Sequence, residues 1–398
     1  RVLGESAPSK QITLGFIGTG DHGVGHNLNQ TLQQPDAKVL AVCDVFESRR
    51  ERARRYVGLR DKTEDCKAYS DFRDVLARKD IDAVVISTPD HWHVPLSIAA
   101  VEAGKDCFCE KPTLTIAEGR TLVNVVKKHE RVYQTGLEDR AVSEYHRMAQ
   151  IVRNGGIGKL QSIDVYLPAG ELFAKEEGTP VPQDLDWNMW LGPAPYVPYS
   201  PKRTDRQAWR NIRDYSGGKL TDWGAHLLDT ALVANFAEHS GPVEVWGKGE
   251  VPQNAMNTVP RTYDVHYRFG NGVTMRVRSG KVALRFEGSD GWVGNAGWRG
   301  KLQASSPEIL AMQWPSEKDK LWPLPPLEHR NFLDCIKSRK ATTYPPEDIH
   351  RLSTVMHVAN IAMELERKLT WDPEKEAFKD DAAANALRSR ESRDWTKA

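Results

Sequence analysis

The amino-acid sequence predicts two folds in succession, an α/β domain over residues 1–136 and an α+β domain over 137–398. In the first half, short apolar strands alternate with helices across short polar breaks, which is typical of a doubly wound parallel sheet. From about residue 137 the strands are longer and alternate apolar with polar residues, which is typical of an open, mainly antiparallel sheet. A chain of 398 residues is long enough for each domain to bury its own core.

The first predicted strand runs to Ile17 and ends in a glycine-rich turn that contains Asp21 and His22. Gly18, Gly20 and Gly23 form the pattern G-x-G-x-x-G ahead of a helix expected over 24–33. Because glycine lacks Cβ, such a turn brings backbone N–H groups and a helix N-terminus close to a pyrophosphate. An ordinary glycine turn is the alternative at this point.

The acid that follows the second predicted strand, 38–42, favours dinucleotide binding over an ordinary glycine turn. The strand ends at Asp44, which lies 44 − 23 = 21 residues after Gly23, near the spacing of the ribose-binding acid in a Rossmann domain. A carboxylate there accepts hydrogen bonds from a ribose 2′-hydroxyl and repels a 2′-phosphate, so NAD is expected rather than NADP. Arg49 and Arg50 weigh against this preference, because a turn could swing one of them toward a phosphate.

The rest of the first half completes the sheet. We expect strands over 83–88, 106–110 and 131–135, the last closing the unit, and helices over 94–103 and 116–128. Ligands of such sheets bind beyond the carboxyl ends of the strands, so residues just after each strand are the candidates. After the glycine turn these are Thr88, Pro89, Asp90, His91, Trp92, His93, Glu110, Lys111 and Pro112.

The second half is expected to hold most of its strands in one sheet. The strands are predicted over 161–167, 243–248, 262–269, 273–278 and 282–287, and Asn271-Gly272 is a hairpin signal. Residues 184–215, rich in Trp, Pro and Arg, are interpreted as an excursion over a binding cleft. We expect a loop or edge strand over 291–300, a helix over 351–365, and a charged tail over 374–398 whose position the pattern leaves open.

Composition excludes several classes of function. A net charge of +1 gives no reason to expect nucleic acid, and no apolar run of roughly 18 residues is present, so no membrane insertion is expected. The five cysteines form no C-x-x-C pair, which argues against a disulfide framework and a structural zinc and favours thiols buried in strands. His91 and His93 form only an H-x-H pair on an expected loop, so no metal is predicted.

Three polar residues are candidates for proton chemistry. Lys111 follows a strand whose end faces the expected nicotinamide, where an ammonium group can stabilise a developing alkoxide. On an expected helix, Asp222, His226 and Asp229 form one polar stripe, and Asp222 could hold one nitrogen of the His226 imidazole and raise its basicity. A solvated lysine and a structural Asp–His pair are the alternatives. Among the aromatic and basic residues expected around the cleft, Arg210 and Tyr215 are selected as substrate contacts.

Together these residues resemble the Gfo/Idh/MocA family, named for glucose-fructose oxidoreductase, inositol dehydrogenase and rhizopine catabolism. The resemblance extends over nearly the whole chain and rests on the glycine motif, Asp44, Thr88-Pro89 with His93, Glu110-Lys111-Pro112, and Asp222-x-x-x-His226. It implies a nicotinamide-dependent oxidoreductase acting on sugars, cyclitols or glycosides, with Lys111, Asp222 and His226 as the catalytic group. It also implies a cis Lys111–Pro112 bond and a homo-oligomer, a dimer or a tetramer.

The resemblance leaves two questions open. Some members of the family are glycosidases that use tightly held NAD to oxidise a sugar transiently, and a nucleotide-binding protein without catalysis is a third class. Whether His226 or Lys111 is the formal base is also open. Residues 186–195 and Tyr215-Ser-Gly-Gly resemble a bacterial branch of the family in which many members carry a twin-arginine export leader. Arg1-Val-Leu-Gly resembles what remains after such a leader is removed, which would place the protein in the periplasm, with the cytoplasm as the alternative location.

Overall fold

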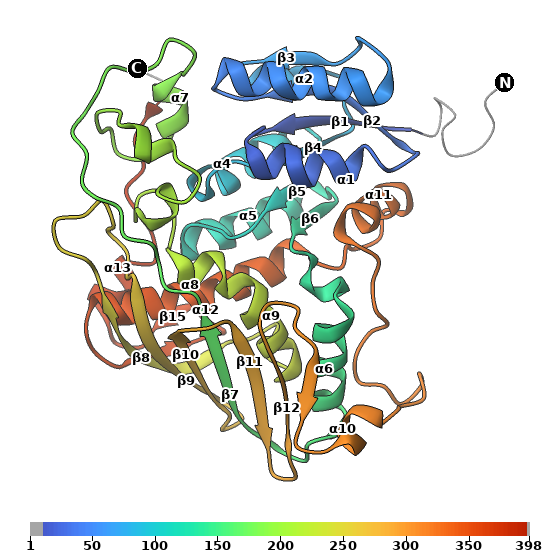
Figure 1. Cartoon of the computed structure of the whole chain (residues 1–398), viewed down its shortest axis with the longest axis vertical. Coiled ribbons are helices and arrows are strands. Elements are labelled where there is room, and N and C mark those ends of the chain that lie inside the picture. The colour runs from blue at the N-terminus through green and yellow to red at the C-terminus, as the bar shows by residue number, and fades with distance from the viewer. Residues whose placement is uncertain (1–10, 396–398) are drawn as a thin grey trace.

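The computed structural model describes residues 11–395, which form two domains stacked along the long axis of the molecule (Figure 1). Arg1-Val-Leu-Gly, the segment that resembles the remnant of a cleaved leader, lies outside these residues. Among the described helices, we find none with both the length and the apolar character needed to cross a membrane. The five cysteines are free and buried, three of them in strands of the first sheet.

The first domain is built on a parallel sheet, as the sequence predicted. The sheet has six strands in the order β3-β2-β1-β4-β5-β6, of which β3 was not among the predicted strands. Its order reverses between the neighbours β1 and β4, so a ligand crevice is expected at their carboxyl ends. The strands are β1 (Ile12–Ile17), β2 (Ala37–Cys43), β3 (Lys67–Tyr69), β4 (Ala83–Ile86), β5 (Asp106–Glu110) and β6 (Tyr133–Gly136).

Two helices of this domain differ from the expectation. The helix expected over 24–33 opens as a wide turn, η2 (Gly23–Leu28), in which the N–H of Asn29 reaches back to Val24, and only then becomes α1 (Asn29–Thr31). Such wide turns are frequent at functional sites. The segment expected as a loop at Asp90–His93 is helical, because Pro89 is extended and α4 (Asp90–Glu102) begins directly after it. The other helices here are α2 (Glu47–Asp61), α3 (Phe72–Ala77) and α5 (Ile116–His129).

The second domain contains a nine-stranded sheet in the order β13-β12-β11-β7-β10-β9-β8-β14-β15. Among its described pairs only β7 and β10 run parallel, so the sheet is mainly antiparallel as predicted, and the hairpin at Asn271-Gly272 is confirmed between β9 and β10. The strands are β7 (Leu160–Leu167), β8 (Pro242–Glu250), β9 (Thr262–Phe269), β10 (Thr274–Ser279), β11 (Ala283–Gly288), β12 (Trp292–Ala296), β13 (Leu302–Ala304), β14 (Leu369–Asp372) and β15 (Ala377–Phe378).

Helices cover one face of this sheet and join it to the first domain (Figure 1). Met148, Leu228 and Val355 lie in the same core as the sheet, and they belong to α6 (Ser143–Arg153), α9 (Gly224–Ala234) and α12 (Pro346–Glu364). The helix α12 also packs against α5, while Phe332 of α11 (Glu328–Ser338) enters the first domain's core. The remaining short helices are η3 (Glu138–Ala141), α7 (Trp187–Leu191), η4 (Pro201–Thr204), η5 (Trp209–Asn211), α8 (Lys219–Asp222), α10 (Pro307–Ala311) and α13 (Ala382–Ala386).

The charged tail, whose position the sequence left open, crosses back to the first domain. Arg393 donates hydrogen bonds to Asn188 Oδ1 at 2.7 Å and to the carbonyl of Gly192 at 3.0 Å. Trp395 then packs edge-on against Trp92, with ring centroids 5.0 Å apart, and lies near Phe72. The tail therefore fastens the 184–215 segment to the helix α4.

Candidate active site

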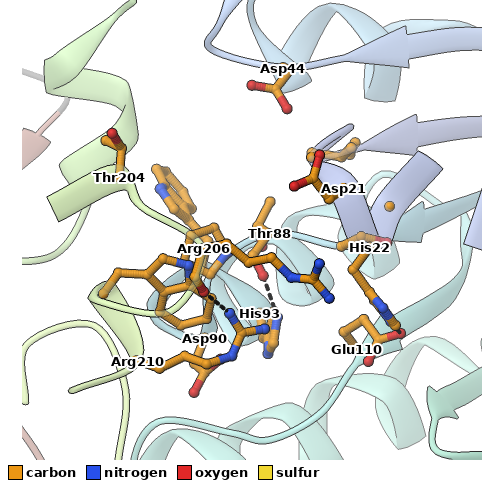
Figure 2. A pocket seen from close by; sticks show the side chains of 18 of the residues that line it. Asp21, His22, Asp44, Thr88, Asp90, His93, Glu110, Thr204, Arg206 and Arg210 are labelled. Carbon is orange, nitrogen blue, oxygen red and sulfur yellow. Dashed lines mark hydrogen bonds and ion pairs between the residues drawn. The ribbon is translucent and has the colours of Figure 1, made fainter. Parts of the chain in front are cut away.

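A cavity of about 560 Å³ connects the two domains at the carboxyl ends of β1, β2 and β4 (Figure 2). The segment 184–215 forms one wall of it, as the sequence predicted for an excursion over a cleft. Of the residues predicted to bind the cofactor, to contact the substrate or to form the catalytic group, all but Tyr215 line this cavity. They are Gly18, Gly20, Asp21, His22, Gly23, Asp44, Thr88, Pro89, His93, Glu110, Lys111, Arg210, Asp222 and His226.

In the glycine turn, Gly18 and Gly23 leave no room for a Cβ, whereas Gly20 does. Gly18 has φ +87°, and a Cβ on it would lie 2.7 Å from the carbonyl of Ser87; one on Gly23 would lie 2.3 Å from the oxygen of Gly18. At Gly20 the nearest atom would be 3.9 Å away, so this side of the turn is open. A pyrophosphate therefore has room beside the turn, and the residues fit a dinucleotide.

Asp44 is held at the end of β2 by the turn itself. Its Oδ2 accepts a hydrogen bond from the N–H of Thr19 at 2.7 Å and its Oδ1 one from the N–H of Phe46 at 2.9 Å. Of the two arginines that follow, Arg49 lies over the Phe46 ring and lines the cavity. The guanidinium of Arg50 instead faces the carbonyl of Asp44.

Below the turn, polar contacts tie the ends of β4 and β5 together. Glu110 accepts a hydrogen bond from Asn27 Nδ2 at 3.0 Å and lies 2.8 Å from His22 Nε2. Burial raises the pKa of Glu110, but His22, Lys111 and Asn27 outweigh it, so its pKa lies below the usual range. The two nitrogens of His93 each lie 2.8 Å from a carbonyl, that of Thr88 and that of Pro112. The Lys111–Pro112 bond is cis, which confirms that prediction.

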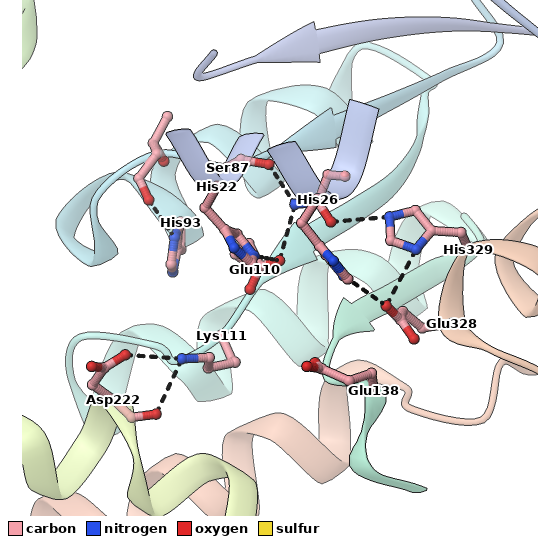
Figure 3. Close-up of polar contacts among 12 residues, drawn as sticks. His22, His26, Ser87, His93, Glu110, Lys111, Glu138, Asp222, Glu328 and His329 are labelled. Atoms are coloured by element: carbon pink, nitrogen blue, oxygen red, sulfur yellow. Dashed lines mark hydrogen bonds and ion pairs between the residues drawn. The ribbon is translucent and has the colours of Figure 1, made fainter. Parts of the chain in front are cut away.

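Lys111 and Asp222 form an ion pair across the domain boundary (Figure 3). Lys111 Nζ donates to the Asp222 carboxylate and to the Asp222 carbonyl, each at 3.1 Å. Burial lowers the pKa of Lys111, but the carboxylates of Asp222 and Glu110 outweigh it and raise the pKa above its usual value. The pKa of Asp222 is correspondingly lowered, because Lys111, Arg210 and Lys219 overcome the effect of burial. Both groups therefore stay charged.

The expected contact between Asp222 and His226 is wrong. An unbroken helix would offer the Asp222 carbonyl to the N–H of His226, but Lys111 takes that oxygen and the chain breaks at Trp223, between α8 and α9. His226 Nδ1 instead lies 2.5 Å from Asp139 Oδ2, on η3. Since a carboxylate accepts, Nδ1 carries the proton and Nε2 is left as the basic nitrogen.

Asp229, the third member of the expected stripe, belongs to a structural ion cluster. Its carboxylate accepts hydrogen bonds from Arg140 Nε and Nη2 at 3.0 and 2.8 Å and from the hydroxyl of Tyr344 at 2.8 Å. Arg140 also donates to Asp348 at 2.6 Å. These side chains are buried. The cluster joins α9, α12 and η3 to one another at a point outside the cavity.

The two predicted substrate contacts have different outcomes. Arg210 stacks on Trp209 at 4.2 Å, lies 3.4 Å from the Asp222 carboxylate and lines the cavity. Tyr215 is wrong as a contact, because it is 1% exposed and packs edge-on against Trp190 in the core of the 184–215 segment. Its hydroxyl accepts a hydrogen bond from Arg203 at 3.2 Å.

Other cavity residues were not predicted from the sequence. Glu138, which lines the cavity, and Asp139, the buried partner of His226, follow β6, where the strand-end rule applied to the other strands would have found them. Trp298, in the Gly/Trp-rich stretch, packs against the His226 ring at 5.5 Å. Arg206 extends into the cavity from the 184–215 segment (Figure 2).

Asp90, His91 and His93 do not converge on a common point, so they form no ligand set. Asp90 accepts a hydrogen bond from Ser216 at 2.6 Å, and His91 Nε2 faces the carbonyl of Trp190 at 2.9 Å. Burial lowers the pKa of His91 to about 4. His91 therefore connects α4 to the 184–215 segment, Asp90 connects it to Ser216, and His93 connects it to the residues that follow β4 and β5.

Comparison with known proteins places this geometry in a family. A model described as "Oxidoreductase family, NAD-binding Rossmann fold" matches residues 12–137, and one described as "Oxidoreductase family, C-terminal alpha/beta domain" matches residues 171–397. A glycosyl hydrolase family 109 protein of Shewanella sp. (strain W3-18-1) is 30% identical over 164 residues, which are 40% of this chain and 36% of that protein. The match thus spans about a third of the length of that relative.

Two solved structures share the fold. An NAD-binding protein from Listeria innocua is 22% identical with a TM-score of 0.67, over 91% of this chain and 97% of the other. An aldose-aldose oxidoreductase from Caulobacter crescentus, complexed with glycerol, is 18% identical with a TM-score of 0.64, over 90% of this chain and 99% of the other. Because the family models match more than half of the chain, it belongs to the Gfo/Idh/MocA oxidoreductase family and has an NAD-binding Rossmann domain.

Proposed function

We propose that this protein transfers hydride between NAD and a CH–OH carbon of a sugar, cyclitol or glycoside. The observation that supports this most is that the Lys111–Asp222 pair and His226, which is paired with the buried Asp139, line the same cavity as the glycine turn and Asp44. Gly18, Gly20, Gly23 and Asp44 would hold the dinucleotide. When bound there, NAD supplies the hydride acceptor.

The side chains divide the work on the hydroxyl group. Lys111, kept protonated by Asp222, donates a hydrogen bond to the carbinol oxygen and stabilises negative charge that develops on it. His226 accepts the hydroxyl proton at Nε2, because Asp139 fixes the proton at Nδ1 and stabilises the imidazolium that forms. The same groups in reverse roles return the proton during carbonyl reduction.

A carbohydrate suits the wall around His226. Trp223 and Trp298 line the cavity with ring centroids 6.1 and 5.5 Å from the imidazole, and their faces can pack on the C–H face of a sugar ring. Arg210 and Glu138 lie on the same cavity and offer donors and acceptors for hydroxyl groups.

A second candidate is an NAD-assisted glycoside hydrolase or lyase. The relatives named glycosyl hydrolase family 109 proteins support it, although the match covers only part of their length. In this reaction the sugar carbon is oxidised, the aglycone is eliminated and the sugar is reduced again, so NAD is regenerated. The same proton-transferring groups serve both candidates.

One screen separates these candidates. The protein is incubated with NAD and a panel of polyols, cyclitols and aryl glycosides while reduced cofactor and released aglycone are followed together. Accumulation of reduced cofactor supports the dehydrogenase, and aglycone release without it supports the glycosidase. Binding of NAD with neither product across the panel would contradict both and favour a non-catalytic protein.

We also propose that copies of the chain associate into a dimer or tetramer, as the family resemblance implies. Light scattering coupled to size exclusion tests this directly. A monomer at micromolar concentration would contradict it.

A further inference from the structure

Three potential metal ligands, His26, Glu328 and His329, lie close together next to the turn η2 (Figure 3). None of them lines the cavity. His26 comes from the wide turn η2, and Glu328 and His329 are the first two residues of α11. Glu328 Oε1 lies 3.3 Å from His26 Nε2 and 3.2 Å from His329 Nδ1. The three ligand atoms all lie within 4.8 Å of one another.

Asn27 fixes which nitrogen of His329 carries a proton. The amide nitrogen of Asn27 donates to Ser87 Oγ at 2.7 Å and to the carboxylate of Glu110 at 3.0 Å, so its oxygen must face the other way. That oxygen lies 3.0 Å from His329 Nε2. An amide oxygen only accepts, so Nε2 donates, and in a neutral imidazole the lone pair then lies on Nδ1.

This lone pair faces the Glu328 carboxylate, an arrangement that is repulsive unless a proton on Nδ1 or a metal ion lies between the two atoms. Glu328 is 5% exposed, and its second oxygen, Oε2, has no hydrogen-bond partner among the described residues. A buried carboxylate with a free oxygen is costly unless it binds a cation or a donor.

The spacing of the ligands suits a small divalent ion. With bonds of about 2.0–2.1 Å, two ligands of a tetrahedral zinc lie roughly 3.3–3.4 Å apart. The two measured distances, 3.3 and 3.2 Å, are close to that value. The contact between His329 and Asn27 is also the kind of hydrogen bond that metal-binding histidines make through their other nitrogen.

We propose that His26 Nε2, Glu328 and His329 Nδ1 bind one divalent transition-metal ion, such as Zn²⁺. Imidazole and carboxylate ligands suit Zn²⁺ and Fe²⁺, and three protein ligands leave a fourth position for water. The His26 side chain is 32% exposed, which gives the ion a path from solvent. The ion joins η2, which follows the cofactor turn, to α11 of the first domain's core.

A second group of potential ligands, Glu138, Asp139 and His226, serves as a contrast. There the guanidinium of Arg299 lies 2.5 Å from Glu138 and 3.6 Å from Asp139. A fixed positive charge already pairs with both carboxylates and would compete with a metal ion for them. No arginine or lysine among the described residues forms an ion pair with the carboxylate of Glu328.

The test measures zinc bound to the full chain in the presence of NAD. After treatment with a chelator and dialysis against Zn²⁺, elemental analysis should find one ion per chain, and the melting temperature should rise. Glu328→Gln and His26→Gln should weaken binding by about tenfold or more. His266→Gln, on the surface of the large sheet, is the matched control and should retain the ion.

Cobalt provides a second readout that needs no variant. Co²⁺ bound at this set should give the intense visible absorption of a four-coordinate site, and Zn²⁺ should displace it. Should Glu328→Gln fail to fold, the more exposed His26→Gln keeps the comparison with the control. Less than about a tenth of an equivalent of zinc in the parent, or equal binding in the parent and His26→Gln, would overturn the proposal.

Discussion

His226 Nδ1 lies 2.5 Å from the carboxylate of Asp139, a residue 87 positions earlier in the chain. The carboxylate of Asp222, only one helical turn before His226, pairs with Lys111 instead. The cavity therefore contains two separate pairs, one imidazole with an acid that orients it and one ammonium with an acid that keeps it charged. Each pair predicts a different response to mutation.

His226→Ala should stay folded and bind NAD, because the glycine turn and Asp44 belong to the other domain. Its rate of hydride transfer should fall by about 10²–10⁴-fold, the usual contribution of a general base. Titration of NAD and single-turnover kinetics on a substrate of the parent measure the two quantities. Near-normal turnover would shift the role of base to Lys111.

Asp139→Asn should lower the rate by less than His226→Ala, because the imidazole remains but its tautomer is no longer enforced. Its carboxylate is fully buried, so thermal unfolding must be measured beside the kinetics. The dissociation constant of NAD should stay unchanged, since Asp139 contacts the imidazole of His226 and not the glycine turn. An unchanged rate of hydride transfer would mean that Asp139 only supports the fold.

Asp222→Asn should change the alkaline limb of the profile of kcat/KM against pH. Asp222 raises the pKa of Lys111, so removing it leaves burial to lower that pKa. Lys111 must be protonated to donate to the alkoxide, and activity is lost as the pH rises through its pKa. The alkaline limb of kcat/KM should therefore move to lower pH, whereas Asp205→Asn, an exposed acid of the same cavity, should leave it in place.

Asp44→Ser should narrow the preference for NAD over NADP. The carboxylate lines the cavity at the end of β2 and would repel a 2′-phosphate. Its removal should therefore lower the ratio of the NADP dissociation constant to the NAD dissociation constant by about tenfold, or ~1.4 kcal/mol. Arg49→Ala should shift the ratio in the opposite direction, because Arg49 is the arginine that lines the cavity. Fluorescence titration with both cofactors measures the ratio, and an unchanged ratio in Asp44→Ser would exclude this acid as the determinant.

Asp229→Asn should destabilise the fold by about 3–5 kcal/mol, because it leaves the buried Arg140 without part of its compensating charge. Urea denaturation measures this loss. Asp264→Asn breaks a half-exposed pair with Arg276 and should cost at most about 1 kcal/mol. Equal costs for the two variants would contradict the structural role of the cluster.

The sequence predicted the parts of this protein that depend on local pattern. The glycine turn, the strand ends at Asp44 and Glu110 and the hairpin at Asn271-Gly272 follow from short spacings that force one backbone geometry. The position of Lys111 followed from the same logic, since parallel strands place their carboxyl ends on one edge of a sheet.

The contacts that the sequence did not predict are contacts across space. Helical spacing favoured an Asp222–His226 contact, but a lysine from the other domain takes the Asp222 carbonyl and the helix breaks. Tyr215 is an aromatic residue of the kind that contacts sugars, and only its packing against Trp190 in the structure shows that it is buried. The partner of His226 could not be found from spacing, because Asp139 lies on a different element.

The return of the tail to the first domain bears on how the protein is made. Trp395 covers the rings of Phe72 and Trp92, and Arg393 ties down the segment beside them. A ribosome makes the chain in sequence order, so these aromatic surfaces emerge long before the tryptophan that covers them. Until then they are exposed to chaperones and to other nascent chains.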